Sequence, residues 1–234
     1  MKIKHDKVLI KISGEALSGK DGFGINDDAI KHLADEIKSI YDLGVKIAIV
    51  VGGGNFFRGR TGGDIDRATA DYMGMLATVM NALALQDTFI SKGIRAKAIT
   101  SIEIRDMAEG YSRRKVLDYL EDDQVVIFGG GTGSPFFSTD TTAALRACEI
   151  GCEVILMAKN IDAVYSDDPK KNPNAVRYKE LTYMDLIEKE LMVMDLTAVT
   201  MCKDNNIKIY VFGLSDDSGI SRVIAGENPG TLIK

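Results

Sequence analysis

The 234-residue sequence contains few of the residue types from which hydrolase centres and metal sites are built. Its only histidines are His5 and His32, and no G-x-S-x-G turn occurs, which disfavours a Ser-His-Asp or Cys-His hydrolase. The three cysteines form no C-x-x-C motif or Cys/His cluster. Cys148 and Cys152 are one helical turn apart beside apolar neighbours, and with Cys202 they are predicted to be buried thiols rather than metal ligands or a disulfide.

Long apolar runs and an excess of basic charge are also absent. No apolar run approaches the roughly 20 residues needed to cross a bilayer, and residues 1–7 lack the apolar middle of a secretory signal. We therefore expect a cytoplasmic protein that does not contact a membrane. The net charge of -5 argues against direct nucleic-acid binding, because such binding needs clustered lysine and arginine to displace counterions.

The hydrophobic pattern predicts an α/β protein. Strand-length apolar runs occur at residues 8–12, 45–51, 94–99, 125–128, 154–157 and 207–212. Helical periodicity occurs between them at residues 27–43, 66–91, 112–120, 141–150 and 183–205. This alternation, with strands apolar on both faces, predicts a mainly parallel sheet covered by helices, in one core or in two small lobes divided near residue 150. The Met-rich segment 66–91 is predicted to be a buried or subunit-interface helix rather than a cofactor-contacting stripe.

Glycine-rich turns follow three of the predicted strands. Residues 14–20 fit most of a Walker A pattern, but Asp21 stands where that motif needs Ser or Thr. The turns at residues 50–59 and 128–140 each lack the third glycine of G-x-G-x-x-G, which disfavours a nicotinamide enzyme. Turns between a strand and a helix offer unpaired N–H groups at the positive end of a helix dipole, so they suit a ligand with several phosphates.

Four charged residues near these turns each allow two interpretations. Lys11 could place a charge on a transferring phosphoryl group or be a solvated strand residue, and Arg58 could bind a phosphate or form a surface ion pair. Asp140 could cap a helix, as could its neighbours, or orient a lysine or a metal. Asp71 could favour a helix dipole or accept hydrogen bonds from sugar hydroxyls. The spacing leaves these alternatives open.

With these residues in view, the chain resembles the amino-acid kinase superfamily and, within it, the bacterial uridylate kinases. The resemblance covers nearly the whole chain and depends on residues 11–15, 52–59, 71–81, 131–140, 162–169, 194–196 and 230–233. It implies a three-layer αβα sandwich in a single domain, 1–234, with a UMP-binding part at 1–150 and an ATP-binding part at 151–234. It also implies transfer of the ATP γ-phosphate to UMP in pyrimidine biosynthesis, with Mg²⁺ on the phosphates and no metal ligand from the protein.

The resemblance also assigns residues to roles. The catalytic residues would be Lys11, Asp140 and Lys159. The ATP site would be formed by Lys11, Ile12, Ser13, Gly14, Gly54, Arg58, Lys159, Asn160, Tyr165 and Asp168. The UMP site would be formed by Gly53, Asp71, Thr132, Gly133, Ser134, Pro135, Phe136, Phe137, Ser138 and Thr139.

The chain departs from the family pattern at residues 157–164. One branch of the family has Lys-Ala-Thr-Lys before its Asp-Gly-Val, whereas this chain has Met-Ala-Lys-Asn and replaces the glycine by Ala163. Lys159 is therefore the candidate for the second catalytic lysine, and a one-residue slip would give its role to a neighbour.

Regulation and assembly are likewise implied only by the resemblance. A GTP effector region would include Gly19, Lys20, Asp21, Gly22, Phe23 and Gly24. A homohexamer activated by GTP and inhibited by UTP is expected.

Three functional hypotheses remain. They are a UMP kinase, a superfamily kinase that phosphorylates a carboxylate or carbamate, and a non-enzymatic nucleotide-binding or oxyanion-storage relative. The block at residues 132–140 favours the first. A UMP phosphate is largely dianionic near neutral pH, since its second pKa is about 6, so this reaction needs no strong general base and is compatible with the scarcity of histidine.

Overall fold

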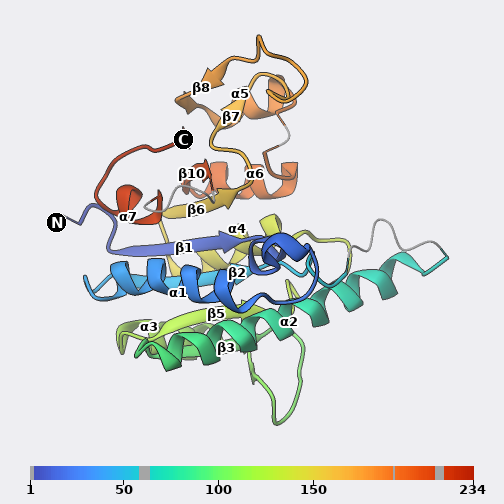
Figure 1. Cartoon of the computed structure of the whole chain (residues 1–234), viewed down its shortest axis with the longest axis vertical. Helices are drawn as coiled ribbons and strands as arrows, with labels where there is room; N and C mark the ends of the chain where they lie inside the picture. Colours follow the sequence, from blue (N-terminus) through green and yellow to red (C-terminus); the bar gives the residue numbers. More distant parts are fainter. Residues whose placement is uncertain (1–2, 58–63, 192, 214–218) are drawn as a thin grey trace.

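Most strands of the described residues form a nine-stranded, mainly parallel sheet (Figure 1). The computed structural model describes residues 3–57, 64–191, 193–213 and 219–234. The strand order is β4 (Glu109–Gly110), β3 (Ala96–Thr100), β5 (Val125–Gly129), β2 (Lys46–Val51), β1 (Lys7–Ile12), β6 (Val154–Lys159), β10 (Lys208–Gly213), β11 (Thr231–Ile233) and β9 (Glu180–Leu181). Neighbouring strands are parallel except for the antiparallel pair of β10 and β11.

The sheet is buried on both faces, which explains the continuous apolar runs of its central strands. Along β1, Val8 and Ile10 point into one hydrophobic cluster and Leu9 points into the other. This alternation follows from the two-residue period of a strand. All residues of β5 are buried. The central strands therefore form a rigid layer whose ends can position functional groups.

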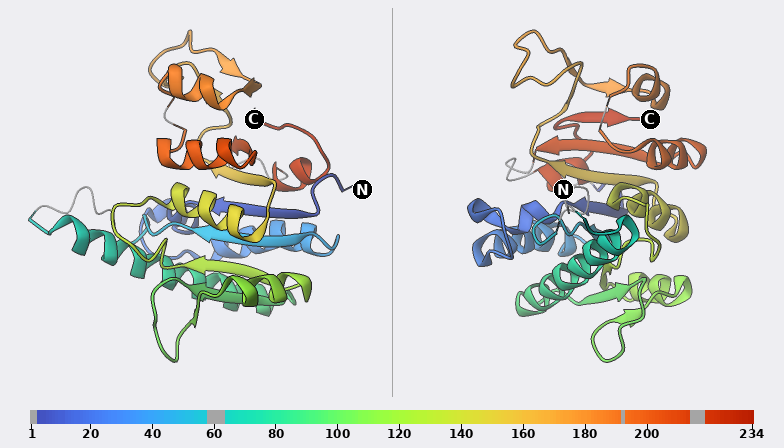
Figure 2. Two further views of the ribbon diagram at one scale, coloured as in Figure 1. Left: turned by 180° about the vertical axis from the view of Figure 1, so that it is seen from behind. Right: turned by 90° about the vertical axis from the view of Figure 1, so that its right-hand side faces the viewer.

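Helices cover both faces of this sheet (Figure 2). On one face, the core includes residues of α1 (Asp27–Tyr41), α2 (Arg67–Ser91) and α7 (Gly219–Ile224). On the other, it includes residues of α3 (Arg113–Glu121), α4 (Thr139–Ile150), α5 (Tyr183–Glu188) and α6 (Leu196–Asp204). The predicted three-layer αβα architecture with a mainly parallel sheet is confirmed.

Several short elements differ from the sequence-based expectation. The segment 183–205, expected as one stretch, forms two helices because Thr182 and Asp195 each cap a new helix start. A separate antiparallel pair, β7 (Val164–Tyr165) and β8 (Arg177–Tyr178), lies with α5 beyond the edge of the main sheet (Figure 1). Strands of two or three residues are too short to show a hydrophobic period, so the sequence did not predict them.

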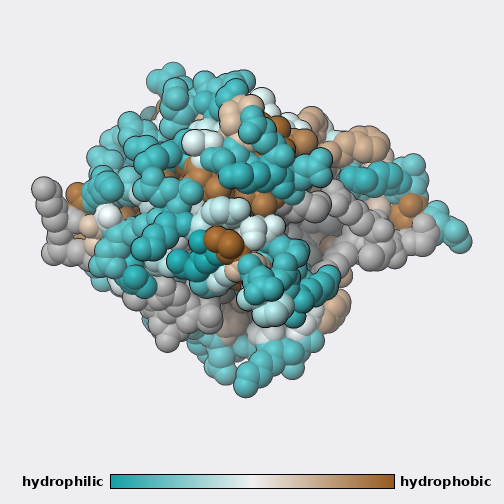
Figure 3. Space-filling model, turned by 90° about the horizontal axis from the view of Figure 1, so that it is seen from above, coloured by the Kyte–Doolittle hydropathy of each residue, from teal (hydrophilic) through white to brown (hydrophobic). Residues whose placement is uncertain are grey.

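The helix α2 is long and apolar enough to cross a membrane by length and composition alone. It packs against β3 and β5, and 44% of its most apolar window is buried inside the structure. Length and composition alone are weak evidence of a membrane span, because the core helix of a globular protein passes the same test. Seen from above, most of the molecular surface is hydrophilic, with small separate hydrophobic areas (Figure 3).

The cysteines are free thiols, as predicted. Cys152 and Cys202 are buried and Cys148 is half-buried. Burial raises the pKa of the Cys152 and Cys202 thiols to about 12, so both are protonated and unreactive near neutral pH.

Candidate active site

The carboxyl ends of β1, β2, β5 and β6 meet at one edge of the sheet, because these strands are parallel neighbours. A cleft of about 720 Å³ lies at this edge. It is lined by residues from each of these strand ends and the turns after them, including Lys11, Gly53, Gly54, Gly131 and Lys159. In open parallel sheets, ligands bind at this edge, so the cleft is the principal candidate site.

Two lysines and a carboxylate meet in the cleft. Lys11 Nζ, near the end of β1, lies 2.8 Å from Asp140 Oδ1, and their side chains are only 12% and 17% exposed. Lys159, at the end of β6, donates a hydrogen bond from Nζ to the carbonyl of Val193. Burial lowers the pKa of Lys159; the charge of Asp140 opposes this and the charge of Lys11 adds to it. The structure thus brings together the three residues to which the family resemblance assigns a catalytic role.

The alternative that Asp140 only caps a helix does not describe its geometry. The N-cap of α4 is Ser138, whose side-chain oxygen accepts a hydrogen bond from the Thr141 amide at 3.0 Å. Asp140 lies in the first turn of α4, where its charge favours the helix dipole while its carboxylate forms the ion pair with Lys11.

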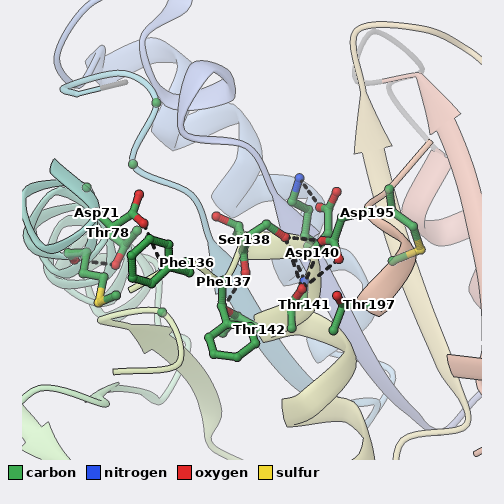
Figure 4. A pocket seen from close by; sticks show the side chains of 18 of the residues that line it. Asp71, Thr78, Phe136, Phe137, Ser138, Asp140, Thr141, Thr142, Asp195 and Thr197 are labelled. Carbon is green, nitrogen blue, oxygen red and sulfur yellow. Dashed lines mark hydrogen bonds and ion pairs between the residues drawn. The ribbon is translucent and has the colours of Figure 1, made fainter. Parts of the chain in front are cut away.

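Asp195 is a cleft residue that was not among the predicted site residues (Figure 4). Its carboxylate accepts hydrogen bonds from the hydroxyls of Ser138 and Thr141, the latter at 2.9 Å and 3.0 Å. It also caps α6 by accepting from the Ala198 amide at 3.0 Å. Burial, the largest influence on the Asp195 pKa, acts to raise it, but these hydrogen bonds together hold the pKa below its usual value. Asp195 therefore joins the start of α4 to the start of α6.

On the opposite side of the cleft, Asp71 contacts the loop that precedes α4 (Figure 4). Asp71 Oδ2 accepts hydrogen bonds from the Phe136 amide at 2.8 Å and from Arg67 Nε at 2.9 Å. The Arg67 guanidinium also lies 5.6 Å from the centre of the Phe136 ring. Phe136 has a φ of +72°, a left-handed conformation that is uncommon for a bulky residue. Arg67 was not predicted, because an arginine one helical turn before an aspartate is a common surface pair.

The predicted acceptor segment lines the cleft only in part. Phe136, Phe137, Ser138 and Thr139 line it, whereas Thr132, Gly133, Ser134 and Pro135 do not. The Thr132 hydroxyl instead bonds within its own turn, to the carbonyl and the amide of Ser134 at 3.1 Å and 3.2 Å.

A second cavity of about 450 Å³ adjoins the cleft and shares Lys159 and Val193 with it. Tyr165 and Asp168, the two residues predicted near an adenosine, both line this cavity. The Tyr165 hydroxyl donates to Asp162 Oδ1 at 2.9 Å, and this bond raises the Tyr165 pKa. Two adjoining cavities with a shared lysine can hold two ligands end to end.

The first two glycine-rich turns pack tightly against each other. A side-chain carbon on Gly14 would lie 2.5 Å from Asn55 Oδ1 and 2.7 Å from the Gly54 amide. Ile12, Ser13 and Gly14 line neither cavity, and the Ile12 side chain is part of the core. Arg58 lies outside the described residues.

After the second of these turns, at residues 52–57, the next helix in the described part of the chain is α2, which begins at Arg67. The described helices therefore place no N-terminal dipole directly behind this turn.

Two further predictions fall outside both cavities. Asn160 Nδ2 donates to Glu15 Oε2 at 3.3 Å. The predicted effector region, residues 19–24, begins with a 3₁₀ helix at Gly19–Asp21 and contacts the second turn through reciprocal hydrogen bonds between Gly24 and Asn55, at 2.7 Å and 3.0 Å.

Comparison with known proteins agrees with this geometry. Residues 6–213 match the model of the Amino acid kinase family. The chain belongs to this family. It is 54% identical to the uridylate kinase of Pediococcus pentosaceus, over 99% of this chain and 98% of that protein.

Solved structures of this family superpose closely. The UMP kinase of Bacillus anthracis has a TM-score of 0.95 and 40% identity, covering 98% of this chain and 96% of that one. The UMP kinase of Ureaplasma parvum has a TM-score of 0.94 and 37% identity, covering 99% and 100%. Within the amino acid kinase family, the chain groups with the uridylate kinases.

Among the residues that the structure describes, this amino acid kinase has no cluster of three or more His, Cys, Asp or Glu side chains that could hold a metal ion. The cleft carboxylates are already engaged, Asp140 by Lys11 and Asp195 by two hydroxyls. A magnesium ion at this site would therefore take most of its ligands from phosphates and water, which is the usual arrangement for Mg²⁺ with nucleotides.

Proposed function

We propose that the chain transfers the γ-phosphoryl group of ATP to UMP, giving UDP and ADP, in pyrimidine nucleotide biosynthesis. The observation that carries this proposal is the meeting of two cavities at Lys159, beside the pair of Lys11 and Asp140. The identity of 54% to a uridylate kinase over nearly the full length of both chains supports UMP as the acceptor.

UMP is assigned to the larger cleft, with Gly53, Asp71 and residues 136–139 lining it and residues 132–135 in the turn that leads to them. ATP is assigned to the smaller cavity, with Tyr165 and Asp168 at the adenosine. Its phosphates would extend past Lys159 toward Lys11, Gly54 and the turn at residues 12–14, and Asn160 and Arg58 belong to the same proposed donor site. The parts 1–150 and 151–234 would thus supply most of the acceptor and donor contacts, respectively, although the larger cleft is also lined by Val193, Met194, Asp195 and Thr197.

The chemistry of this transfer requires charge more than proton transfer. The UMP phosphate is a nucleophile without further deprotonation, because its second pKa is about 6. The protein must align two anions in line and stabilise the charge that spreads over the γ-phosphoryl oxygens. Lys11 and Lys159 supply positive charge, and Asp140 holds the Lys11 ammonium in place by its ion pair. Mg²⁺, when bound to the phosphates, would neutralise part of the remaining negative charge.

A coupled assay of ADP release tests the proposal against its rivals. The purified chain is incubated with ATP and Mg²⁺ together with UMP, CMP, glutamate or carbamate. UDP formation with UMP far above the other acceptors supports the proposal. Turnover only with glutamate or carbamate identifies an acylphosphate-forming kinase, and nucleotide binding without ADP release identifies a non-enzymatic relative.

Assembly and regulation form a second part of the proposal. A homohexamer in the cytoplasm, activated by GTP near residues 19–24 and inhibited by UTP, is what the family resemblance supports. One further observation favours assembly: Tyr72, Leu76 and Met80 follow each other along α2 and are 46%, 50% and 46% exposed. Exposed apolar stripes of this kind are typical of subunit contacts. Sedimentation analysis of the purified chain measures its assembly, and initial rates with added GTP or UTP measure its regulation.

A further inference from the structure

A buried arginine lies behind the cleft and is not one of the residues assigned to catalysis. Arg146 is on α4, only 3% exposed, and its guanidinium lies 3.7 Å from the centre of the Tyr111 ring and 5.7 Å from that of Phe128. Its Nη1 forms an ion pair with Glu149, which also accepts a hydrogen bond from the Tyr111 hydroxyl at 2.6 Å. A buried charge is tolerated only with such partners, so this side chain is held in one position.

The second terminal nitrogen of Arg146 points toward the acceptor side of the cleft. Arg146 Nη2 donates to Ser101 Oγ at 2.7 Å, and Ser101 Oγ lies 2.7 Å from the carbonyl oxygen of Gly131. A serine hydroxyl has one proton, and a guanidinium and a carbonyl can only donate and accept, respectively. The hydroxyl must therefore accept from Arg146 and donate to Gly131. The positive charge at one end strengthens the whole chain of hydrogen bonds.

This chain of contacts reaches the turn that leads to the acceptor segment. Gly130, Gly131 and Gly133 have φ values of +77°, +57° and +84°. Glycine adopts positive and negative φ about equally, so a free chain would not hold all three residues in this conformation. The turn lies directly on Ser101, since a side-chain carbon on Gly133 would be 3.0 Å from the Ser101 carbonyl oxygen. On its other side, the Gly130 amide donates to Thr78 Oγ1 at 2.7 Å.

We propose that Arg146 is a positioning residue that acts through Ser101 to hold the turn 130–133, and with it the acceptor segment, in the conformation that binds UMP. The inference rests on the proposed function and deepens it by naming residues that set acceptor affinity without lining the cleft. Arg146 Nε is buried and has no hydrogen-bond partner among the described residues. The guanidinium is therefore fixed by ring stacking and by the contacts of its two terminal nitrogens. One of these nitrogens donates to Ser101, which in turn donates to Gly131 of the acceptor turn.

The test compares Ser101→Ala, Arg146→Lys and a matched control, Tyr111→Phe. Ser101→Ala removes the link to Gly131 while leaving the pair of Arg146 and Glu149. Tyr111→Phe removes a hydroxyl from the same cluster but leaves the link intact. Losing a charge-assisted hydrogen bond corresponds to about a tenfold change in a dissociation constant. We therefore expect Ser101→Ala to raise the KM for UMP about tenfold. The KM for ATP and kcat at saturating UMP are expected to stay within about twofold of the wild-type values.

Arg146→Lys keeps the charge beside Glu149 but lacks the planar fork, so it is expected to raise the KM for UMP in the same way. Tyr111→Phe is expected to leave it unchanged. Thermal midpoints of all variants, measured alongside, separate loss of fold from loss of positioning.

An unchanged KM for UMP in a folded Ser101→Ala variant overturns the inference. Equal rises of both KM values, or the same rise in Tyr111→Phe, also overturn it by assigning the cluster to general stability. Failure of the proposed function has a different signature, because the wild-type chain would then form no UDP.

Discussion

The turn at residues 52–57 is held by buried amides, whereas the turn at residues 129–138 is held by hydroxyls and a carboxylate. In the first turn, Asn55 and Asn81 are almost fully buried and exchange side-chain hydrogen bonds at 2.7 Å and 3.0 Å. Asn81 also donates to the Gly52 carbonyl at 2.7 Å. In the second turn, Ser138 is anchored to Asp195 and the turn leads directly into α4.

Gly53 of the first turn and Gly131 of the second require glycine for different reasons. Gly53 has no left-handed φ, but a side-chain carbon there would lie 2.6 Å from the Gly74 carbonyl oxygen of α2. Gly131 has a left-handed φ of +57° and only ordinary contact distances, the shortest being 3.5 Å to Met75. Glycine thus meets a need for space at Gly53 and a need for backbone conformation at Gly131.

The largest effect is expected from the helix that follows the second turn. Asp140→Asn removes the charge that pairs with Lys11, and we expect kcat to fall by about 100-fold, roughly 2.7 kcal/mol, with the fold retained. Steady-state kinetics with both nucleotides saturating measures this effect. Wild-type turnover in the variant would remove Asp140 from the group that supports transfer.

In the first turn, the expected effect of a substitution for Gly53 is on stability. Gly53→Ala forces α2 away from the turn, and overpacking of this kind is expected to lower the free energy of unfolding by about 1–3 kcal/mol. The matched control is Gly74→Ala, because nothing lies within 4 Å of a side-chain carbon at that helical position. An alanine there is expected to stabilise the helix by about 0.5–1 kcal/mol. Urea denaturation of both variants decides whether Gly53 is required for space.

The Asp195 carboxylate, which holds the second turn, and the Asn81 amide, which holds the first, should contribute to stability with a different dependence on pH. The folded-state pKa of Asp195 is lowered from the ordinary value of 3.8, so its contribution is fully present above that value and is lost as the pH falls through the folded-state pKa. The stability difference between wild type and Asp195→Asn, about 1–3 kcal/mol near neutral pH, should therefore shrink below pH 3.8.

Amides do not titrate in this range, so Asn81→Ala should keep a constant deficit relative to wild type. Denaturation curves recorded from pH 7 downward provide both differences. Parallel pH profiles for the two variants would refute the distinction between the anchors.

The smallest effect is expected at Gly131. Alanine in the left-handed conformation costs about 1–2 kcal/mol, whereas asparagine tolerates it better. Gly131→Ala should therefore be less stable than Gly131→Asn, although asparagine is larger. If stability instead falls with side-chain size, space rather than backbone conformation governs this turn as well. Chemical denaturation of the pair is sufficient to distinguish these outcomes.

The sequence predicted the central layer because its strands are buried on both faces and its long helices have clear periodicity. The strands expected at 8–12 and 125–128 were placed within one residue of the observed β1 and β5. The hairpin of β7 and β8 was missed because two-residue strands show no period. The break between α5 and α6 depends on the caps Thr182 and Asp195, whose effect is decided by local hydrogen bonds.

Lys11 was proposed from its place at a strand end, whereas Lys159 was proposed only from the family resemblance; both line the cleft. The predicted site was incomplete where a residue acts through tertiary contacts. Asp195 lies far from Lys11 in the sequence, by more than 180 positions. It contacts Ser138 only in the folded chain, and no spacing rule relates these two residues. Arg67 and Arg146 are ordinary helix residues in the sequence, and only the fold brings them to Phe136 and Ser101.

In the proposed transfer, the phosphoryl group passes beside Lys11, close to Lys159 where the two cavities meet. The most direct measurement is the turnover of Lys11→Ala with saturating ATP and UMP, after circular dichroism has shown that the variant is folded. We expect kcat to fall by about 100-fold or more, roughly 2.7 kcal/mol or above. Turnover equal to that of the wild type in the folded variant would contradict it.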